Sequence, residues 1–395
     1  AVGAASCAAG PTAGGGARRT RRGTRRLSVS LQTQTSVGIG GEAWGVGRSA
    51  SRGGGRGPAT VDGIADTRRH GAPSGYAGYP VALREVMETA MSEDATAALR
   101  EELARLREER QAVLLVHNYQ NPEVQDVADF LGDSLGLSRQ AAATDAATIV
   151  FCGVHFMAQT AKLLSPDKLV LLPESAAGCP MADMITPESL RAFKAEHPGL
   201  PVVAYVNTTA EVKAECDICC TSANAVQVVR SLPEDRLLFV PDQYLAQWVA
   251  QQVPDKEIIP YGGFCPTHAR INPRELQEAK AAHPEALTIG HPECPPDILA
   301  LCDAVRSTSG MVKFARESPA REFIIATECG MVYRLQQDIP DKVFHGLDSI
   351  VCPNMKRTTL QSVVTALREL RTRIEIPDDI AAAARRAVQR MVEIG

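Results

Sequence analysis

The stretch "PDKEIIPYGGFCP" at residues 254–266 begins with a Pro-Asp-Lys triplet and ends with a Cys-Pro pair. A Pro-Asp-Lys triplet followed by a Cys-Pro pair at a similar separation occurs twice more in the chain. The triplets begin at Pro166, Pro254 and Pro340, and the pairs begin at Cys179, Cys265 and Cys352. Both motifs therefore recur at intervals of 86 to 88 residues, which indicates a threefold internal repeat of domain size.

Longer segments align at the same intervals. "LLVHNYQ" (114–120) aligns with "VVAYVNT" (202–208) and, shifted by one residue, with "LTIGHPE" (287–293). Each segment is an apolar run that ends in polar residues, and parallel strands present ligand-binding groups at such ends. The aligned polar residues are His117, Tyr205 and His291, followed two positions later by Tyr119, Asn207 and Glu293.

A second aligned set carries a hydroxyl group in every repeat and falls at predicted helix starts. Its members are Ser134, Ser222 and Thr308. A hydroxyl, free backbone N–H groups and the helix dipole together bind carboxylate or phosphate. A single residue of this kind is usually only a helix cap, but three in register around one centre predict an anion site.

The fold class follows from the alternation of two patterns within each repeat. Apolar runs such as "AVLLV" (112–116) and "EFIIA" (322–326) predict buried strands, while "PESLRAFKAEH" (187–197) and "PRELQEAKAAH" (273–283) predict helices. We expect an α/β protein of three pseudo-threefold-related αβα domains with short parallel sheets and an active site at their common centre. The expected domains span residues 91–196, 197–283 and 284–395, the last with C-terminal helices.

The first 90 residues differ from the rest of the chain. Residues 1–60 hold 15 of the 31 glycines and nine arginines, but no lysine and one acid, Glu42. Such a composition predicts a disordered extension. It is typical of a plastid transit peptide, but "MSEDATAALREELARLREER" at Met91 resembles a natural start, which favours translated upstream sequence instead.

The remainder of the chain is acidic. Removing the nine arginines and one glutamate of residues 1–60 from totals of 42 basic and 46 acidic residues leaves 33 against 45, a net charge of −12. Binding to bulk nucleic acid is therefore not expected. No run approaches the roughly 18 apolar residues of a membrane span, so no membrane association is expected.

The chain has eleven cysteines, and only Cys179, Cys265 and Cys352, which follow the three Pro-Asp-Lys triplets, share a register. A buried cysteine is usually a small apolar residue, but three in register predict metal ligands. Cys216 and Cys219 form a C-x-x-C without a second pair at zinc-finger spacing, so a metal role is not favoured for them. The cysteines assigned to packing are Cys152, Cys294, Cys302 and Cys329.

Three thiolates around one centre suit a four-iron cluster with one open iron. Electron-transfer clusters of this type usually have four cysteine ligands. An iron without a protein ligand can act as a Lewis acid on a substrate hydroxyl or carboxylate and ease the loss of water. The aligned polar residues would then hold an anionic substrate beside the cluster.

With these residues the chain resembles the quinolinate synthase family, the iron–sulfur enzymes of de novo NAD biosynthesis. The resemblance runs from Met91 to the C-terminus. It rests on "HNYQNPEVQDVADFLGDSL", "FCGVHFMAQTAKLLSPDK", "YVNTTAEVKAECDICCTSANAV", "GHPEC", "STSGM" and "CPNMK". Some members carry C-x-x-C-x-x-C at the third ligand, but Gly346 and Ser349 occupy the earlier positions here. No disulfide switch is therefore expected at that place.

The resemblance implies a transferase that condenses iminoaspartate with dihydroxyacetone phosphate to quinolinate, with loss of phosphate and water. It implies one 4Fe-4S cluster with Cys179, Cys265 and Cys352 as ligands, and Tyr119 as the catalytic tyrosine. It also implies functional coupling to an L-aspartate oxidase or dehydrogenase that produces iminoaspartate, and a cytoplasmic or, with a transit peptide, a plastid location. The residues that match the family's substrate and phosphate contacts are His117, Ser134, Tyr205, Asn207, Ser222, His268, His291, Glu293, Ser307 and Thr308.

The required chemistry can also be assigned from residue types. Ring formation from an imine and a triose phosphate calls for an anion site, an acid and base, and a Lewis acid. We expect Glu293, with His291 beside it, to be the general base, although a lone acid at a strand end is more often simply solvated.

Tyr119 and Tyr205 are expected to relay protons or orient a carbonyl. His117 and Asn207 are expected to hold carboxylate or carbonyl groups, and His268 to contact substrate or cluster. His155, His197, His283 and His345 are expected to be ordinary loop or cap residues.

Two other classes of function stay open at this point. A redox or sensor protein would use the cluster for electron transfer and would need a fourth ligand, which the threefold register does not supply. A zinc hydrolase with cysteine and histidine ligands would be colourless. The colour of protein purified without oxygen, and its response to the two substrates, distinguish these classes from a synthase.

Overall fold

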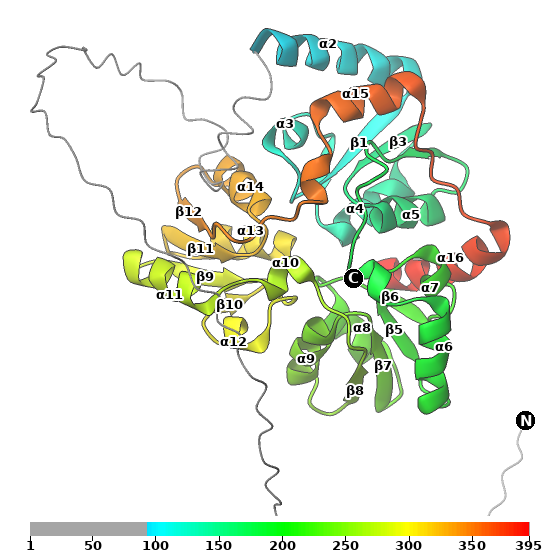
Figure 1. Ribbon diagram of the computed structural model, residues 1–395, viewed down its shortest axis with the longest axis vertical. Helices are drawn as coiled ribbons and strands as arrows, with labels where there is room; N and C mark the ends of the chain where they lie inside the picture. Colours follow the sequence, from blue (N-terminus) through cyan, green and yellow to red (C-terminus); the bar gives the residue numbers. More distant parts are fainter. Residues whose placement is uncertain (1–92, 395) are drawn as a thin grey trace, which may run out of the picture. The chain divides into compact units, whose positions relative to one another are not determined.

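The computed structural model describes residues 93–394, and the extension expected at residues 1–90 lies outside this range. The described residues form three four-stranded sheets, and all pairings between their named strands are parallel. Figure 1 shows the three sheets and their helices around a common centre. The predicted α/β fold with three αβα domains is therefore confirmed. None of the described helices is long and apolar enough to cross a membrane.

The first sheet shows why the strands read as continuous apolar runs. Its central strands are buried on both faces. The helices α2 (Glu93–Arg110) and α15 (Leu360–Glu369) pack on one side, and α4 (Ser134–Ala143) and α5 (His155–Leu164) pack on the other. Its strands are β1 (Ala112–His117), β2 (Phe130–Gly132), β3 (Thr148–Cys152) and β4 (Leu169–Leu171), in the spatial order β2-β1-β3-β4. Its helices are α2 (Glu93–Arg110), α3 (Pro122–Gln125), α4 (Ser134–Ala143) and α5 (His155–Leu164).

The second sheet repeats this order. Its strands are β5 (Val202–Tyr205), β6 (Ile218–Cys220), β7 (Arg236–Val240) and β8 (Glu257–Pro260), in the order β6-β5-β7-β8. The preceding and intervening helices are η1 (Ala182–Met184), α6 (Pro187–Glu196), α7 (Ala210–Lys213), α8 (Ala225–Ser231) and α9 (Gln243–Gln252). The second strand in sequence again lies at one edge, and the first strand pairs with the third.

The third sheet has the same topology, so all three repeats share one strand order. Its strands are β9 (Leu287–Gly290), β10 (Ala304–Val305), β11 (Glu322–Ala326) and β12 (Val343–Gly346), in the order β10-β9-β11-β12. Its helices are α10 (Pro266–Ala269), α11 (Pro273–Ala282), α12 (Pro296–Leu299), α13 (Thr308–Glu317) and α14 (Gly330–Asp338). The topology supports the threefold repeat that the sequence intervals indicated.

The helices predicted from "PESLRAFKAEH" and "PRELQEAKAAH" begin where a polar side chain caps them. The Thr186 hydroxyl accepts the backbone N–H of Ser189, whose own side chain bonds back to Thr186, so a capping box starts α6. The Asn272 side chain accepts the backbone N–H of Arg274 at 2.9 Å and starts α11. Both helices have proline at their first position, where its missing N–H costs nothing.

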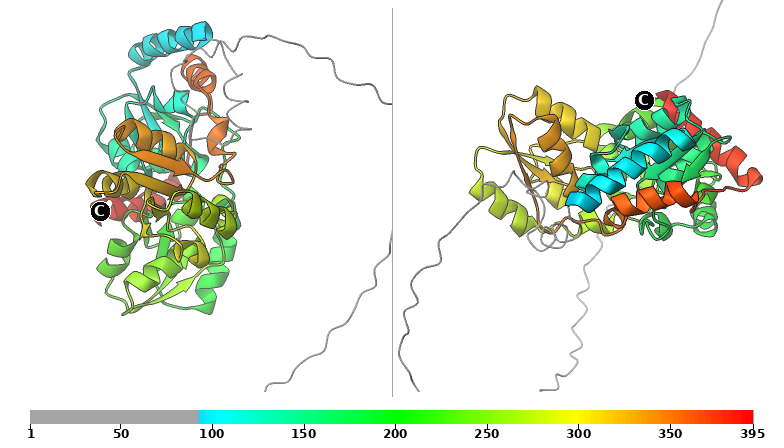
Figure 2. Two further views of the ribbon diagram at one scale, coloured as in Figure 1. Left: turned by 90° about the vertical axis from the view of Figure 1, so that its left-hand side faces the viewer. Right: turned by 90° about the horizontal axis from the view of Figure 1, so that it is seen from above.

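The C-terminal helices pack on the first two sheets rather than on the third. η2 (Met355–Arg357) and α15 (Leu360–Glu369) follow β12, and α15 lies beside α2 (Figure 2). The backbone then pairs with β4, because Ile374 donates its N–H to the carbonyl of Val170 at 2.9 Å. The last helix, α16 (Asp378–Ile394), packs against β6 and α7. The final segment therefore ties the repeats together, and the domain boundaries expected from sequence stay a prediction.

Candidate active site

The carboxyl ends of the first strands of all three sheets meet at one cavity. β1 ends at His117, β5 ends at Tyr205, and His291 follows β9 directly. These residues line a cavity of about 250 Å³. Every candidate site residue named from the sequence lines it except Ser307. The Ser307 hydroxyl instead caps α13 by accepting the backbone N–H of Gly310 at 3.2 Å.

One cysteine from each repeat reaches this cavity. Cys179 follows β4, Cys265 caps α10, and Cys352 lies between β12 and η2. Their three sulfur atoms do not all lie within 4.8 Å of one another. A single zinc ion with bonds of about 2.3 Å would draw its sulfurs to roughly 3.8 Å apart. In a four-iron cluster each thiolate binds a different iron, so its cysteine sulfurs do not have to converge on one metal ion.

The electrostatics of the three thiols also fit a cationic group. Burial raises the pKa of Cys179 to about 12 and raises the pKa values of Cys265 and Cys352 too, and the carboxylates of Glu293 and Glu328 add to these rises. Thiols in such a pocket lose their protons when they bind metal ions, because the metal charge stabilises the thiolates.

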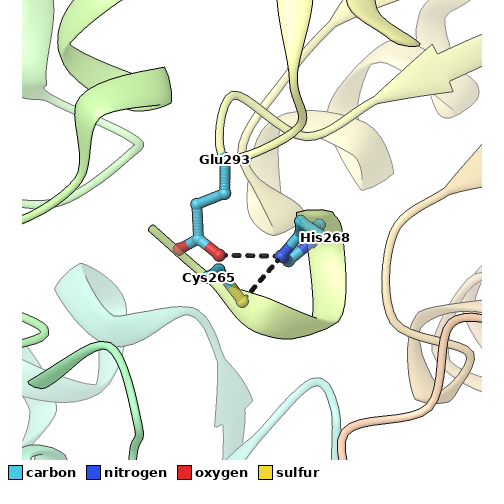
Figure 3. Close-up of side chains that lie close together, drawn as sticks. All are labelled: Cys265, His268 and Glu293. Atoms are coloured by element: carbon cyan, nitrogen blue, oxygen red, sulfur yellow. Dashed lines mark hydrogen bonds and ion pairs between the residues drawn. The ribbon is translucent and has the colours of Figure 1, made fainter. Parts of the chain in front are cut away.

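Glu293 and His268 meet beside Cys265 (Figure 3). The Nδ1 atom of His268 lies 2.8 Å from Oε2 of Glu293 and 3.2 Å from the sulfur of Cys265. Both side chains are buried. His268 therefore connects one candidate cluster ligand with the candidate general base.

Glu293 is ionised despite its burial. Burial raises the pKa of this carboxyl group, but the neighbouring His268 and the hydrogen bonds from His268 and Tyr205 lower the pKa below its ordinary value. An ionised carboxylate only accepts hydrogen bonds. The Nδ1 atom of His268 therefore carries the hydrogen of their contact.

Thr327 extends this contact into a hydrogen-bonded relay. The Nε2 atom of His268 lies 2.8 Å from the Thr327 hydroxyl, which lies 2.6 Å from the Tyr119 hydroxyl. In a neutral His268 ring, Nε2 accepts from Thr327, which in turn accepts from Tyr119. Burial and the charge of Glu293 raise the pKa values of Tyr119 and Tyr205 well above the ordinary value, so both are donors. The relay joins Tyr119 to Glu293.

His117 and His291 are neutral members of the site. Burial lowers the pKa of His117 to about 4 and that of His291 to about 3, although the nearby Glu293 opposes both shifts. The Nε2 atom of His291 lies 3.2 Å from the Ser222 hydroxyl, and its ring stacks on His268 with centroids 5.0 Å apart. A neutral imidazole offers one donor and one acceptor, which suits carbonyl and carboxylate groups.

Because these histidines resist protonation, we expect the fold to lose stability as the pH falls from about 6.5 toward 4. The unfolded chain protonates its histidines near pH 6.5, whereas folded His117 does so only at about 4. The unfolded state then binds more protons, and the free energy of unfolding should fall by up to about 1.4 kcal/mol per pH unit for each such histidine. Urea unfolding of metal-free protein across this range measures the slope. The variant His117→Gln should flatten it, and an unchanged slope would contradict the assignment.

The aligned hydroxyl residues occupy two kinds of position. Ser134 and Thr308 are the first residues of α4 and α13, as predicted. The prediction was wrong for Ser222, which lies in a turn before α8. The reason is that the Asn224 side chain accepts the backbone N–H of Thr221 at 2.8 Å and closes an additional turn there. All three hydroxyl residues nevertheless line the cavity.

Sequence reasoning missed Thr327 and Glu328, which follow β11 and stand at the centre of the site's hydrogen bonds. At the repeat intervals they match Gly153-Val154 and Pro241-Asp242, so the threonine does not recur and the acid recurs only in the second repeat. The available signal was a polar pair directly after the buried run "EFIIA". Cys216 and Cys219 do not line the cavity.

A second group of possible metal ligands lies away from the cavity. His283 caps α11, Glu322 begins β11, and His345 lies within β12, so the expectation that His345 is a loop or cap residue was wrong. Oε1 of Glu322 lies 2.8 Å from Nδ1 of His283 and 2.7 Å from Nε2 of His345. The rings stack 3.6 Å apart with planes at 21°. Both ring nitrogens converge on the same carboxylate oxygen, so the group is a carboxylate shared by two stacked imidazoles.

The fold and the cavity define a class of protein: a three-domain α/β protein in which each domain supplies one cysteine and several polar side chains to a shared centre. Comparison with known proteins then shows the family. A family model described as "Quinolinate synthetase A protein" matches residues 101–393. The chain belongs to this family, which implies an iron–sulfur cluster.

Curated relatives agree with the family assignment. The chain is 55% identical over 295 residues to a quinolinate synthase of Thermodesulfovibrio yellowstonii, which covers 74% of this chain and 97% of the relative. It is 54% identical over 302 residues to a quinolinate synthase of Methanoregula boonei, which covers 76% of this chain and 100% of the relative. A quinolinate synthase of Geobacter metallireducens is 54% identical over 297 residues, with 75% and 97% covered.

Proposed function

We propose that the chain is a quinolinate synthase, a transferase that condenses iminoaspartate with dihydroxyacetone phosphate and releases phosphate and water. The observation that carries this proposal is the cavity in which one cysteine from each repeat lies beside the relay that ends at Glu293. Ring formation needs anion binding, proton transfer and dehydration, and the cavity offers groups for each. An anaerobic assay tests it. Quinolinate should form only when both substrates are present, and no quinolinate with both would overturn it.

The proposed cofactor is one 4Fe-4S cluster held by Cys179, Cys265 and Cys352. Their convergence on one cavity, one from each repeat, supports this assignment. Among residues 93–394, no other cysteine lines the cavity. When bound, such a cluster with one iron free of protein ligands supplies a Lewis acid for the loss of water.

Glu293 is the proposed general base, and Tyr119 the proposed acid. The ionised Glu293 carboxylate can take a proton from substrate carbon, and Tyr119 can donate one to a departing hydroxyl group. Thr327 and His268 connect the two. Once the His268 hydrogen has moved from Nδ1 to Nε2, Nδ1 can take the proton of Glu293 while Nε2 gives its hydrogen to Thr327 and Thr327 gives its own to Tyr119, which restores all four groups. A substrate carbonyl that accepts from Tyr205 would remove a hydrogen bond from Glu293 and make it more basic.

Iminoaspartate is proposed to bind through His117, Ser134 and Asn207. The buried Oδ1 atom of Asn207 has no hydrogen-bond partner in the described part of the chain, and it lines the cavity. A buried amide oxygen of this kind is costly unless a ligand supplies a donor. The imine N–H is a suitable donor, and neutral His117 and the Ser134 hydroxyl can bind the carboxylates.

The phosphate of the triose is proposed to bind at Ser222 and Thr308. We expect Ser222→Ala to raise the KM for dihydroxyacetone phosphate, because one charge-assisted hydrogen bond worth about 1 to 3 kcal/mol is lost. The KM for iminoaspartate should change less. Steady-state kinetics with each substrate varied in turn measure the split. The control is Ser231→Ala, since this hydroxyl donates to the carbonyl of Val228 at 2.7 Å and lies outside the cavity. An unchanged KM for the triose in Ser222→Ala would argue against the phosphate assignment.

The proposed place in metabolism is de novo NAD biosynthesis, where quinolinate supplies the pyridine ring. Iminoaspartate must come from oxidation of aspartate, so an L-aspartate oxidase or dehydrogenase is the proposed supplier. Because this imine hydrolyses readily in water, we expect the two enzymes to work in the same compartment. An assay that couples a purified oxidase to this protein should yield quinolinate from aspartate and the triose.

A further inference from the structure

A carboxylate beside the proposed cluster ligands is held by four donors. Glu328 follows β11, is fully buried and lines the cavity. Its Oε2 accepts the backbone N–H of Gly330 at 2.7 Å, and its Oε1 accepts the backbone N–H of Cys352 at 3.2 Å. The Cys329 thiol lies 3.4 Å from Oε1. Glu328 therefore holds the backbone of one proposed cluster ligand directly.

The fourth donor is the ammonium group of Lys356, which is also nearly buried. Its Nζ atom lies 3.0 Å from Oε1 and 3.1 Å from Oε2 of Glu328. The same Nζ donates to the backbone carbonyl of Tyr119 at 2.6 Å. One buried ion pair thus links the loop of Cys352, in the third repeat, to Tyr119 in the first.

The backbones at this junction are in close contact. A Cβ atom at Gly330 would lie 2.8 Å from the carbonyl group of Tyr119 and 2.9 Å from Oε2 of Glu328, so only glycine fits without a shift. The Asn121 side chain donates to the carbonyls of Lys356 and Thr358 at 3.1 and 2.8 Å. Little freedom is left for Tyr119 to move relative to the Cys352 loop.

We propose that Glu328 and Lys356 are positioning residues that fix Tyr119 relative to Cys352 and balance the charge beside the cluster. The inference rests on the proposed function, because Tyr119 is the proposed acid and Cys352 a proposed cluster ligand of that reaction. Glu328 holds the Cys352 backbone, and Lys356 holds the Tyr119 backbone. The ammonium group also cancels a buried negative charge that would otherwise face the thiolate of Cys352.

The charges of Glu328 and Lys356 should change the reduction potential of the cluster in opposite directions, which loss of packing alone would not do. A negative charge near a cluster stabilises its oxidised form, and a positive charge stabilises its reduced form. Lys356→Met should therefore make the reduction potential more negative, and Glu328→Gln should make it more positive. The double variant should return toward the potential of the unaltered enzyme, because both charges are then removed together.

Turnover supplies a second readout. In both single variants we expect kcat to fall roughly 10-fold to 100-fold, the effect of a misplaced catalytic group. The KM for dihydroxyacetone phosphate should change less than about 3-fold, because the proposed phosphate residues are not displaced. Glu328→Gln keeps the shape of the side chain, so it remains informative if Lys356→Met folds poorly.

Lys342 offers a matched control in the same repeat. Its Nζ also donates to two backbone carbonyls, those of Ala315 and Ser318, both at 2.6 Å, but it lies outside the cavity. Lys342→Met should leave the potential and kcat unchanged. Potentials that shift in the same direction in Lys356→Met and Glu328→Gln, or in neither, would overturn the inference.

Hydrogen exchange separates this inference from the proposed function. In protein without cluster or substrate, peptides that contain Tyr119 and Cys352 should exchange faster in Lys356→Met than in Lys342→Met, and equal exchange would overturn the positioning role. Failure of the unaltered enzyme to form quinolinate would reject the proposed function. The reduction potentials and the exchange rates would still test the positioning role of Glu328 and Lys356.

Discussion

Replacing Cys265 with alanine should leave the protein colourless and inactive. Each repeat supplies one proposed thiolate ligand. The variant therefore keeps two ligands, and one iron of the cluster loses its bond to the protein. Iron and sulfide should fall from about four of each per chain to near zero. Metal analysis and visible absorption of protein purified without oxygen measure the loss. The variants Cys179→Ala and Cys352→Ala should behave in the same way.

Matched controls come from cysteines of the second repeat. Cys216 donates its thiol to the carbonyl of Val212 at 3.1 Å, and Cys219 is buried on β6, and neither lines the cavity. Their alanine variants should stay brown and active. A brown Cys265→Ala protein with its full iron content would refute the ligand assignment.

Glu293→Gln should abolish most turnover while the cluster still assembles. Glutamine keeps the size of the side chain and can still bond to Tyr205 and His268, but it cannot take a proton. The loss of a general base typically lowers turnover by roughly 100-fold to 10,000-fold. Iron content and visible absorption should match those of the unaltered enzyme, because Glu293 is not a proposed ligand.

Glu322→Gln is the control for this variant. Glu322 also binds two histidines, His283 and His345, but it lies outside the cavity, so its variant should turn over normally. Near-normal turnover of Glu293→Gln would instead show that Glu293 is an ordinary acid at a strand end.

The repeat explains how much of the fold could be predicted from the sequence. Because parallel strands covered on both faces are continuously apolar, "AVLLV" and "EFIIA" marked β1 and β11 directly. Equal intervals then predicted three similar sheets. The packing of α15 on α2 could not be predicted, since both helices follow the same amphipathic pattern whichever sheet they cover. Only tertiary contacts decide their partner.

The candidate site was predictable where chemistry recurs in register. His117, Tyr205 and His291 lie at or directly after the ends of three aligned strands. Cys179, Cys265 and Cys352 recur at the same intervals. Thr327 and Lys356 have no such register. They join the site through side-chain contacts across repeats, 208 residues apart for Thr327 and Tyr119 and 237 for Lys356 and Tyr119. Contacts over such separations leave no periodic signal.

We propose that the three repeats share one open-site iron–sulfur cluster and use it to make quinolinate. Iron, sulfide and zinc analysis of protein purified without oxygen, combined with a quinolinate assay on the same sample, tests it most directly. We predict a brown protein with about four irons and four sulfides per chain that forms quinolinate from iminoaspartate and dihydroxyacetone phosphate. A colourless protein that holds zinc, or a brown protein that forms no quinolinate from the two substrates, would contradict the claim.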